Sequence, residues 1–160
     1  MMAMNNDKDL RKHLVSLLRG GQAYDAFEDV IPEFTKKDRE RVPPGAEHSA
    51  WQIIDHMVRA LDDIVEYSDN ENGKYEEKNW PEDYWASTPA RNWKDTIQAY
   101  QKSRKRLEEL ILDPERDLLE PFPWSKDHTL LREALVAGDH QAHHIGQLVE
   151  LQRWLIASRD

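Results

Sequence analysis

Apolar residues recur along the chain at intervals of three and four positions, the spacing that places side chains on one face of an α-helix. This pattern predicts helical segments over residues 7–18, 23–31, 49–67, 89–111 and 129–157. Gly20 and Gly21 separate the first two segments. No stretch shows the alternation of apolar and polar residues that is typical of a β-strand. The sequence therefore predicts an all-α protein, an antiparallel four-helix bundle that forms one domain over residues 1–160.

The longest predicted connection, between residues 69 and 88, carries large aromatic side chains at Trp80, Tyr84 and Trp85. A connection of this length in a compact domain is generally packed by its own side chains or used for function. Two interpretations stay open: a lid over the helices, or a structural plug that only fills space. Thr88 followed by Pro89 predicts the start of the next helix, as its N-cap and its first helical residue.

Length and apolar content limit the class of protein. With 160 residues, 39% of them apolar, the chain has the size of one ordinary domain with a single core. No stretch approaches the roughly 18 consecutive apolar residues that a membrane-spanning helix needs. The first seven residues also lack the basic and apolar regions of a signal peptide, so a cytoplasmic location is expected.

Charge and cysteine content limit the chemistry. The net charge of −9 and the isoelectric point near 5.3 oppose binding to the phosphate backbone of nucleic acids. The chain contains no cysteine, which excludes disulfides, thiolate metal ligands and a cysteine nucleophile of its own. Any thiol chemistry would therefore use a thiol supplied by another molecule.

The strongest chemical signal is the pair His140 and His144 in the last predicted helix. Side chains four residues apart project from the same helical face one turn apart, so two imidazoles at this spacing can close on one metal ion. His143 lies to the side of this face. The same face continues through the apolar residues Ala137, Leu148, Leu151 and Leu155. The pair is therefore expected to point into a core.

A third candidate ligand, His56, lies in the middle of the predicted helix 49–67. A single histidine on an inward face is generally a core residue bonded to a carbonyl. Facing helices of a bundle also build metal sites, and one histidine added to the pair gives a three-nitrogen site. Three protein ligands leave open positions for water and substrate, as in a catalytic site. Asp63, close to the face of His56, either orients a ligand or lies at the rim.

Other polar residues near the pair are weaker candidates. Gln141 stands where the His-Glu-x-x-His motif of zinc proteases has its general base, so that class is excluded. Glu133, two turns before His140 on nearly the same face, is the candidate catalytic carboxylate. It can equally pair with an arginine or cap the helix. If His56 is not a ligand, His48 is the alternative candidate. The remaining histidines are His13, His128 and His143.

Residues 140–147, with the sequence His-Gln-Ala-His-His-Ile-Gly-Gln, resemble the His-x-x-x-His-x-Gly-Gln signature of the DinB-like (DinB/YfiT) metal-binding bundles. Residues 49–57 resemble the first-ligand helix of that family, and the Trp-Pro-x-Asp-Tyr-Trp loop extends the resemblance over most of the chain. The resemblance implies that His56, His140 and His144 are the metal ligands. It also implies a four-helix bundle that is frequently a homodimer.

The resemblance further implies a bound divalent ion such as zinc or nickel. Some relatives are thiol S-transferases that use bacillithiol or mycothiol, or thiol-dependent isomerases. An ion held by three neutral imidazoles lowers the pKa of a coordinated water or thiol. The leading hypothesis is thus an enzyme that transfers a small-molecule thiol to a small electrophile. The alternatives are a metal-dependent hydrolase and a non-catalytic metal-binding sensor or interaction module.

The acidic balance predicts that the protein does not bind DNA. A fluorescently labelled DNA duplex should show no change in anisotropy on titration with the protein at physiological ionic strength, because no basic motif offsets the net charge of −9. Tight binding that weakens with added salt would contradict this expectation.

Overall fold

A computed structural model describes residues 2–158, with side chains from residue 6 onward, and within this range the protein is helical. Residues 1, 159 and 160 of the expected domain lie outside the described residues. In the described part of the chain an isolated β-bridge joins Pro121 and Thr129. The elements in chain order are α1 (Met2–Arg19), α2 (Phe27–Val30), η1 (Ile31–Glu33), α3 (Ala50–Ser68), η2 (Asn70–Asn72), α4 (Trp93–Leu112) and α5 (Leu130–Ala157).

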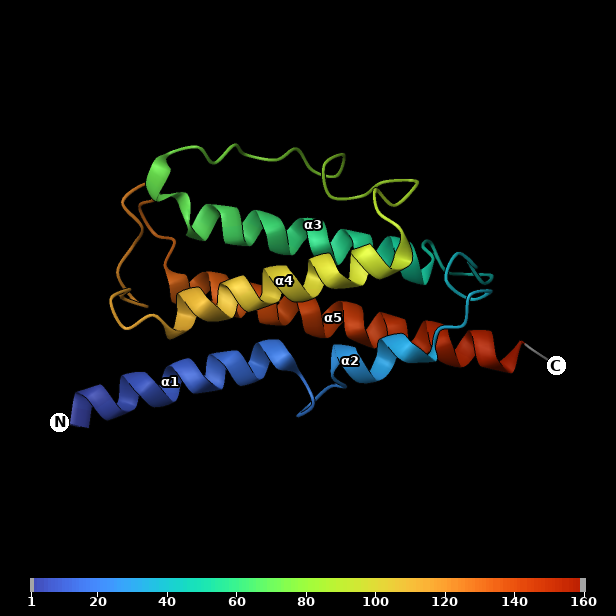
Figure 1. The fold of residues 1–160 in the computed structure, drawn as a ribbon, viewed down its shortest axis with the longest axis horizontal. Helices are drawn as coiled ribbons and strands as arrows, with labels where there is room; N and C mark the ends of the chain where they lie inside the picture. Colours follow the sequence, from blue (N-terminus) through green and yellow to red (C-terminus); the bar gives the residue numbers. More distant parts are fainter. Residues whose placement is uncertain (1, 159–160) are drawn as a thin grey trace.

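The four long helices lie alongside one another, with α3 and α1 each packed against both α4 and α5 (Figure 1). Their apolar faces meet in one core. Its largest fully buried side chains are Leu18, Phe27, Ile54, Met57, Tyr100, Leu107, Leu110, Ile111, Leu130, Ile145, Leu148 and Leu155. None of the helices in residues 2–158 is long and apolar enough to span a bilayer. The expected all-α class is therefore confirmed.

Polar residues at the helix starts explain where α3 and α5 begin. The Ser49 hydroxyl accepts a hydrogen bond from the Gln52 backbone N–H, while the Gln52 side chain accepts one from the Ser49 backbone N–H. This reciprocal capping box fixes the first turn of α3. Thr129 caps α5 in the same sense by accepting from the Arg132 N–H. Both starts agree with the sequence expectation.

The predicted start of α4 at Thr88 and Pro89 is wrong, because the helix begins at Trp93 with Asn92 as its N-cap. The Asn92 side chain accepts a hydrogen bond from the Asp95 N–H at 3.0 Å. The segment before it is bonded to α3 instead. Gln52 donates to the Ser87 carbonyl at 2.9 Å, and the Ala90 N–H donates to the Asp55 carboxylate at 3.4 Å. These tertiary bonds outweigh the local cap signal.

Residues 73–92 form the long aromatic connection, which returns along the length of α3 before α4 begins (Figure 1). The Tyr84 hydroxyl donates to the Asp63 carboxylate of α3 at 2.7 Å. Gln52, Asp55 and Asp63 therefore bind this connection at three positions along α3. The path brings its aromatic residues to the middle of α3, where His56 lies.

Helix α5 carries two glycines in very different surroundings. A Cβ atom added at Gly138 would lie 2.5 Å from Leu17 of α1, so the absent side chain permits the close packing of these helices. A Cβ added at Gly146 would meet nothing within 4 Å. A substitution at Gly138 therefore changes both packing and helix propensity, whereas a substitution at Gly146 changes helix propensity alone.

Gly138→Ala should lower the free energy of unfolding by about 1 to 2 kcal/mol, because overpacking against Leu17 outweighs the gain in helix propensity. Gly146→Ala, the matched control, should leave the free energy unchanged or raise it by up to about 1 kcal/mol. Urea denaturation followed by circular dichroism measures both. Equal effects at the two positions would show that α1 and α5 do not pack this closely.

Candidate metal centre

The three histidines predicted from the sequence meet at one point between α3 and α5. His56 and His144 are almost fully buried, with 3% and 5% of their surfaces exposed, and His140 is half-buried. The Nε2 atom of His140 lies 2.9 Å from that of His56 and 3.1 Å from that of His144. One nitrogen from each ring therefore faces a common centre, and the three form a group able to hold a metal ion.

The outer nitrogens of two rings have acceptor partners that fix their protonation. His56 Nδ1 lies 3.1 Å from the Tyr84 carbonyl oxygen, and His144 Nδ1 lies 2.7 Å from Oε1 of Gln147. Because both partners are acceptors, each Nδ1 carries the proton and donates it. Each Nε2 then presents its lone pair to the centre. This arrangement, with the outer N–H bonded to a carbonyl oxygen, is typical of histidines that ligate metals.

Burial keeps all three imidazoles neutral. Desolvation lowers the pKa of His140 to about 3, with a further contribution from the neighbouring His144 and His56. Desolvation is also the main reason that the pKa of His144 falls to about 4. The pKa of His56 is lowered by the same cause, in part opposed by its bond to the Tyr84 carbonyl. The neutral imidazole is the form that binds metal, so no proton must leave the ligands near neutral pH.

This donor set fits a divalent first-row ion. Such ions accept imidazole nitrogen, and three protein ligands leave coordination positions for water or substrate. With Nδ1 protonated, the Nε2 atoms of His56 and His144 are acceptors, and both lie within hydrogen-bonding distance of the Nε2 atom of His140. The residues present therefore suit a bound metal, in agreement with the sequence analysis.

Trp85 forms an aromatic wall beside this centre. Its ring stacks on His56 with centroids 3.8 Å apart and planes tilted by 5°. It also stacks on His48, with centroids 3.9 Å apart, and contacts the edge of His144 at 6.1 Å. His48 therefore does not replace His56 in the cluster but touches it through Trp85. Trp80, 68% exposed, approaches His56 at 6.3 Å.

Glu133, the carboxylate proposed from helical geometry, lies in the first turn of α5 and is 3% exposed. It accepts a hydrogen bond from Arg132 at 2.7 Å and lies 3.3 Å from His128 Nδ1. The structure thus gives it the arginine partner that the sequence left as the alternative. A catalytic role for Glu133 stays a prediction.

Three other polar residues have defined places. Asp63 binds the Tyr84 hydroxyl, so it holds the segment whose backbone carbonyl orients His56. Gln141 is buried, accepts from Tyr100 and donates to the Leu18 carbonyl at 2.6 Å. It therefore connects α5 to α4 and α1 in the core. His143 is exposed to the side of the ligand face, as its helical position predicts, and its ring contacts that of His144 with centroids 4.9 Å apart.

Sequence reasoning missed two groups that orient the ligands. The Tyr84 contact uses a backbone carbonyl, for which a side-chain pattern carries no signal. Gln147 does carry one, because it lies three residues after His144 and so shares its face of α5. Trp85 was anticipated only as part of an aromatic lid or plug.

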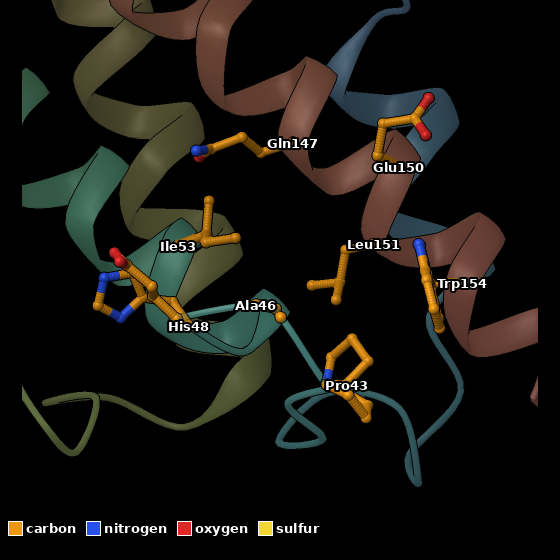
Figure 2. Close-up of a pocket in the computed structure, with 11 residues that line it drawn as sticks. Pro43, Ala46, His48, Ile53, Gln147, Glu150, Leu151 and Trp154 are labelled. Carbon is orange, nitrogen blue, oxygen red and sulfur yellow. The ribbon is translucent and has the colours of Figure 1, made fainter.

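A pocket of about 550 Å³ lies beside the metal centre, between the segment 43–48, the start of α3 and the second half of α5 (Figure 2). Its lining includes His48 and Gln147, the two residues that contact Trp85 and His144. Figure 2 shows Gln147 extending from α5 at the end of the pocket where Ile53 and His48 also lie. The centre therefore adjoins a space large enough for a small molecule.

Comparison with known proteins gives one match. The sequence model of a family described as the DinB superfamily matches residues 21–148, which include all three clustered histidines. No curated protein and no solved structure matches the chain. The matched span covers α3, α4 and the first two thirds of α5.

Single replacement of His56, His140 or His144 by Ala should reduce the metal content of purified protein to a small fraction of one ion per chain, because two imidazoles hold an ion much more weakly than three. His143→Ala, one residue from His144 but exposed, is the matched control and should keep its metal. Mass spectrometry of protein prepared without added metal measures the content. Circular dichroism checks that each variant is folded, and full metal occupancy in the three folded variants would rule out this site.

Proposed function

The chain belongs to the DinB superfamily, and from this premise we propose that it is a divalent-metal-dependent thiol S-transferase acting on a small electrophile. The observation that carries the proposal is the cluster of three Nε2 atoms, one from α3 and two from α5, directed at one point. When bound there, a divalent ion lowers the pKa of a coordinated thiol and so supplies thiolate near neutral pH.

The chain's own residues hold and orient the ligands. His56, His140 and His144 donate their Nε2 lone pairs, while the Tyr84 carbonyl and the Gln147 side chain keep the proton on the outer nitrogen. Trp85 covers one face of His56 and excludes water from that side. This supports the proposed role of the aromatic connection 73–92 as a lid over the centre.

The absence of cysteine supports a reaction in which the thiol is a second substrate. The chain has no cysteine, so a thiol must enter as a small molecule. The three neutral imidazoles would add no negative charge to a bound ion and so would preserve its ability to acidify a thiol. The pocket beside the centre offers room for such a substrate or for the electrophile.

A second function is favoured by the burial of the centre. His56 and His144 are 3% and 5% exposed, and Trp85 stacks directly on His56. A metal enclosed by aromatic rings suits a sensor or an interaction module, because substrate would have limited access. Under this proposal the ion would stabilise one arrangement of the loop and would turn nothing over.

Further features are proposed from the family and the site together. Zinc or nickel is the proposed ion, since three-imidazole sites accept both. An antiparallel four-helix bundle is the proposed architecture, formed by α1, α3, α4 and α5. A homodimer in the cytoplasm, with no nucleic-acid or membrane partner, completes the proposal.

Turnover distinguishes these functions. Metal-loaded protein incubated with glutathione, cysteine or bacillithiol and an alkylating electrophile should consume thiol faster than the uncatalysed reaction, because the centre supplies thiolate. His144→Ala should abolish the excess rate and His143→Ala should retain it. Absence of turnover in fully metal-loaded protein with every thiol would favour the sensor, and ester cleavage without thiol would favour a hydrolase.

Trp85→Ala tests the role of the aromatic connection. Removal of a lid should change the KM for electrophile and the rate of metal loss to a chelator by about tenfold, with little change in the melting temperature. Trp124→Ala is the matched control, since that tryptophan is also half-buried and stacks on Phe122 in the connection 113–129. A large drop in melting temperature with unchanged KM and metal loss would identify Trp85 as a structural plug.

A further inference from the structure

The pocket beside the metal centre has a lining that specifies the chemistry of its occupant. Two regions far apart in the sequence form it: residues 43–48 with Ile53 of α3, and the stretch from Gln147 to Trp154 of α5. Its volume of about 550 Å³ lies within the range of small-molecule sites. In Figure 2 Pro43 and Leu151 point into the space between α5 and the segment 43–48.

The pocket is connected to the ligands through single side chains. Gln147 lines the pocket and accepts the hydrogen bond from His144 Nδ1 at 2.7 Å. His48 lines it as well and stacks on Trp85, which in turn stacks on His56. A molecule in this pocket is therefore separated from His144 by one residue, Gln147, and from His56 by two, His48 and Trp85.

Most of the lining is apolar. The apolar residues are Pro43, Pro44, Ala46, Ile53, Leu151 and Trp154. Trp154 is 56% exposed, an unusual state for so large an aromatic side chain, and a bound apolar group would cover part of it. Burial of an apolar group against these residues supplies the main favourable term for binding.

The charged residues of the lining are both acidic. They are Glu47 and Glu150, and among residues 2–158 the pocket draws no lysine or arginine into its lining. Glu150 is bonded to Arg153 at 2.5 Å, and its carboxylate points away from the pocket in Figure 2. An anionic group in contact with this lining would therefore lose its hydration without gaining a lysine or arginine partner from it.

We infer that this pocket binds the apolar portion of the electrophilic substrate, an uncharged or cationic small molecule with an aromatic or aliphatic group, and that it excludes carboxylates. The inference rests on the proposed function and adds the substrate class. His48 and Gln147 form the polar end of the pocket, where the reactive group of the molecule lies nearest to the metal centre. An anionic thiol would use another approach to the centre.

The test uses three probes that share a phenyl group and differ in charge: phenethyl alcohol, phenethylamine and phenylacetate. Nuclear magnetic resonance of the metal-loaded, ¹⁵N-labelled protein should show saturable shifts at residues 43–48 and 147–154 with the alcohol and the amine. At these residues phenylacetate should bind about tenfold more weakly or not at all, since no lysine or arginine lines the pocket. Equal binding of phenylacetate, or shifts confined to other residues, would overturn the inference.

Two variants locate the binding. Trp154→Ala removes an exposed side chain, so the variant should fold normally. Its affinity for the alcohol and the amine should fall by about tenfold. Leu119→Ala is the matched control, because Leu119 is 65% exposed in the distant connection 113–129 and should leave binding unchanged. Unchanged affinity in folded Trp154→Ala would contradict the assignment.

Metal content of the same samples separates this inference from the proposed function. His140→Ala should lose metal yet retain probe binding, because His140 does not line the pocket. Retained probe binding in wild-type protein that holds no metal would support the pocket and defeat the metal site. Full metal content without any saturable probe shift would defeat the pocket alone.

Discussion

Three imidazole nitrogens held together away from water are the constraint on which the rest of the structure depends. The Nε2 atoms of His56 and His144 lie 2.9 and 3.1 Å from that of His140, and their common orientation depends on interactions made elsewhere on each residue. The Tyr84 carbonyl and Gln147 provide these interactions at the outer nitrogens, and helix packing provides them at the backbone. The same arrangement would direct the three Nε2 atoms at one bound cation.

Much of the site could be predicted because its information is local. The spacing of His140 and His144 defines a shared face on any α-helix, and the apolar residues on that face indicate its direction. His56 followed from the same periodicity on α3. The resemblance to the DinB superfamily is confirmed by the match over residues 21–148. It implied that His56 and the pair His140 and His144 belong to one metal site.

What the sequence could not supply depends on tertiary contacts. Helix α4 begins at Trp93, later than predicted from Thr88 and Pro89, because residues 87–90 bind the side chains of Gln52 and Asp55. The Tyr84 carbonyl acts through the backbone, and Glu133 found partners in Arg132 and His128 that helical geometry could not select. The position of the aromatic connection over His56 likewise required the path of residues 73–92 along α3.

The central claim is that one ion binds the three Nε2 atoms. The most direct measurement is a crystal structure of protein isolated without added metal, with anomalous diffraction recorded on both sides of the metal absorption edge. The account predicts a single anomalous peak within about 2.0 to 2.2 Å of Nε2 of His56, His140 and His144. A metal-loaded crystal whose peak lies elsewhere, or is bound through Nδ1 or by fewer than these three rings, would contradict it.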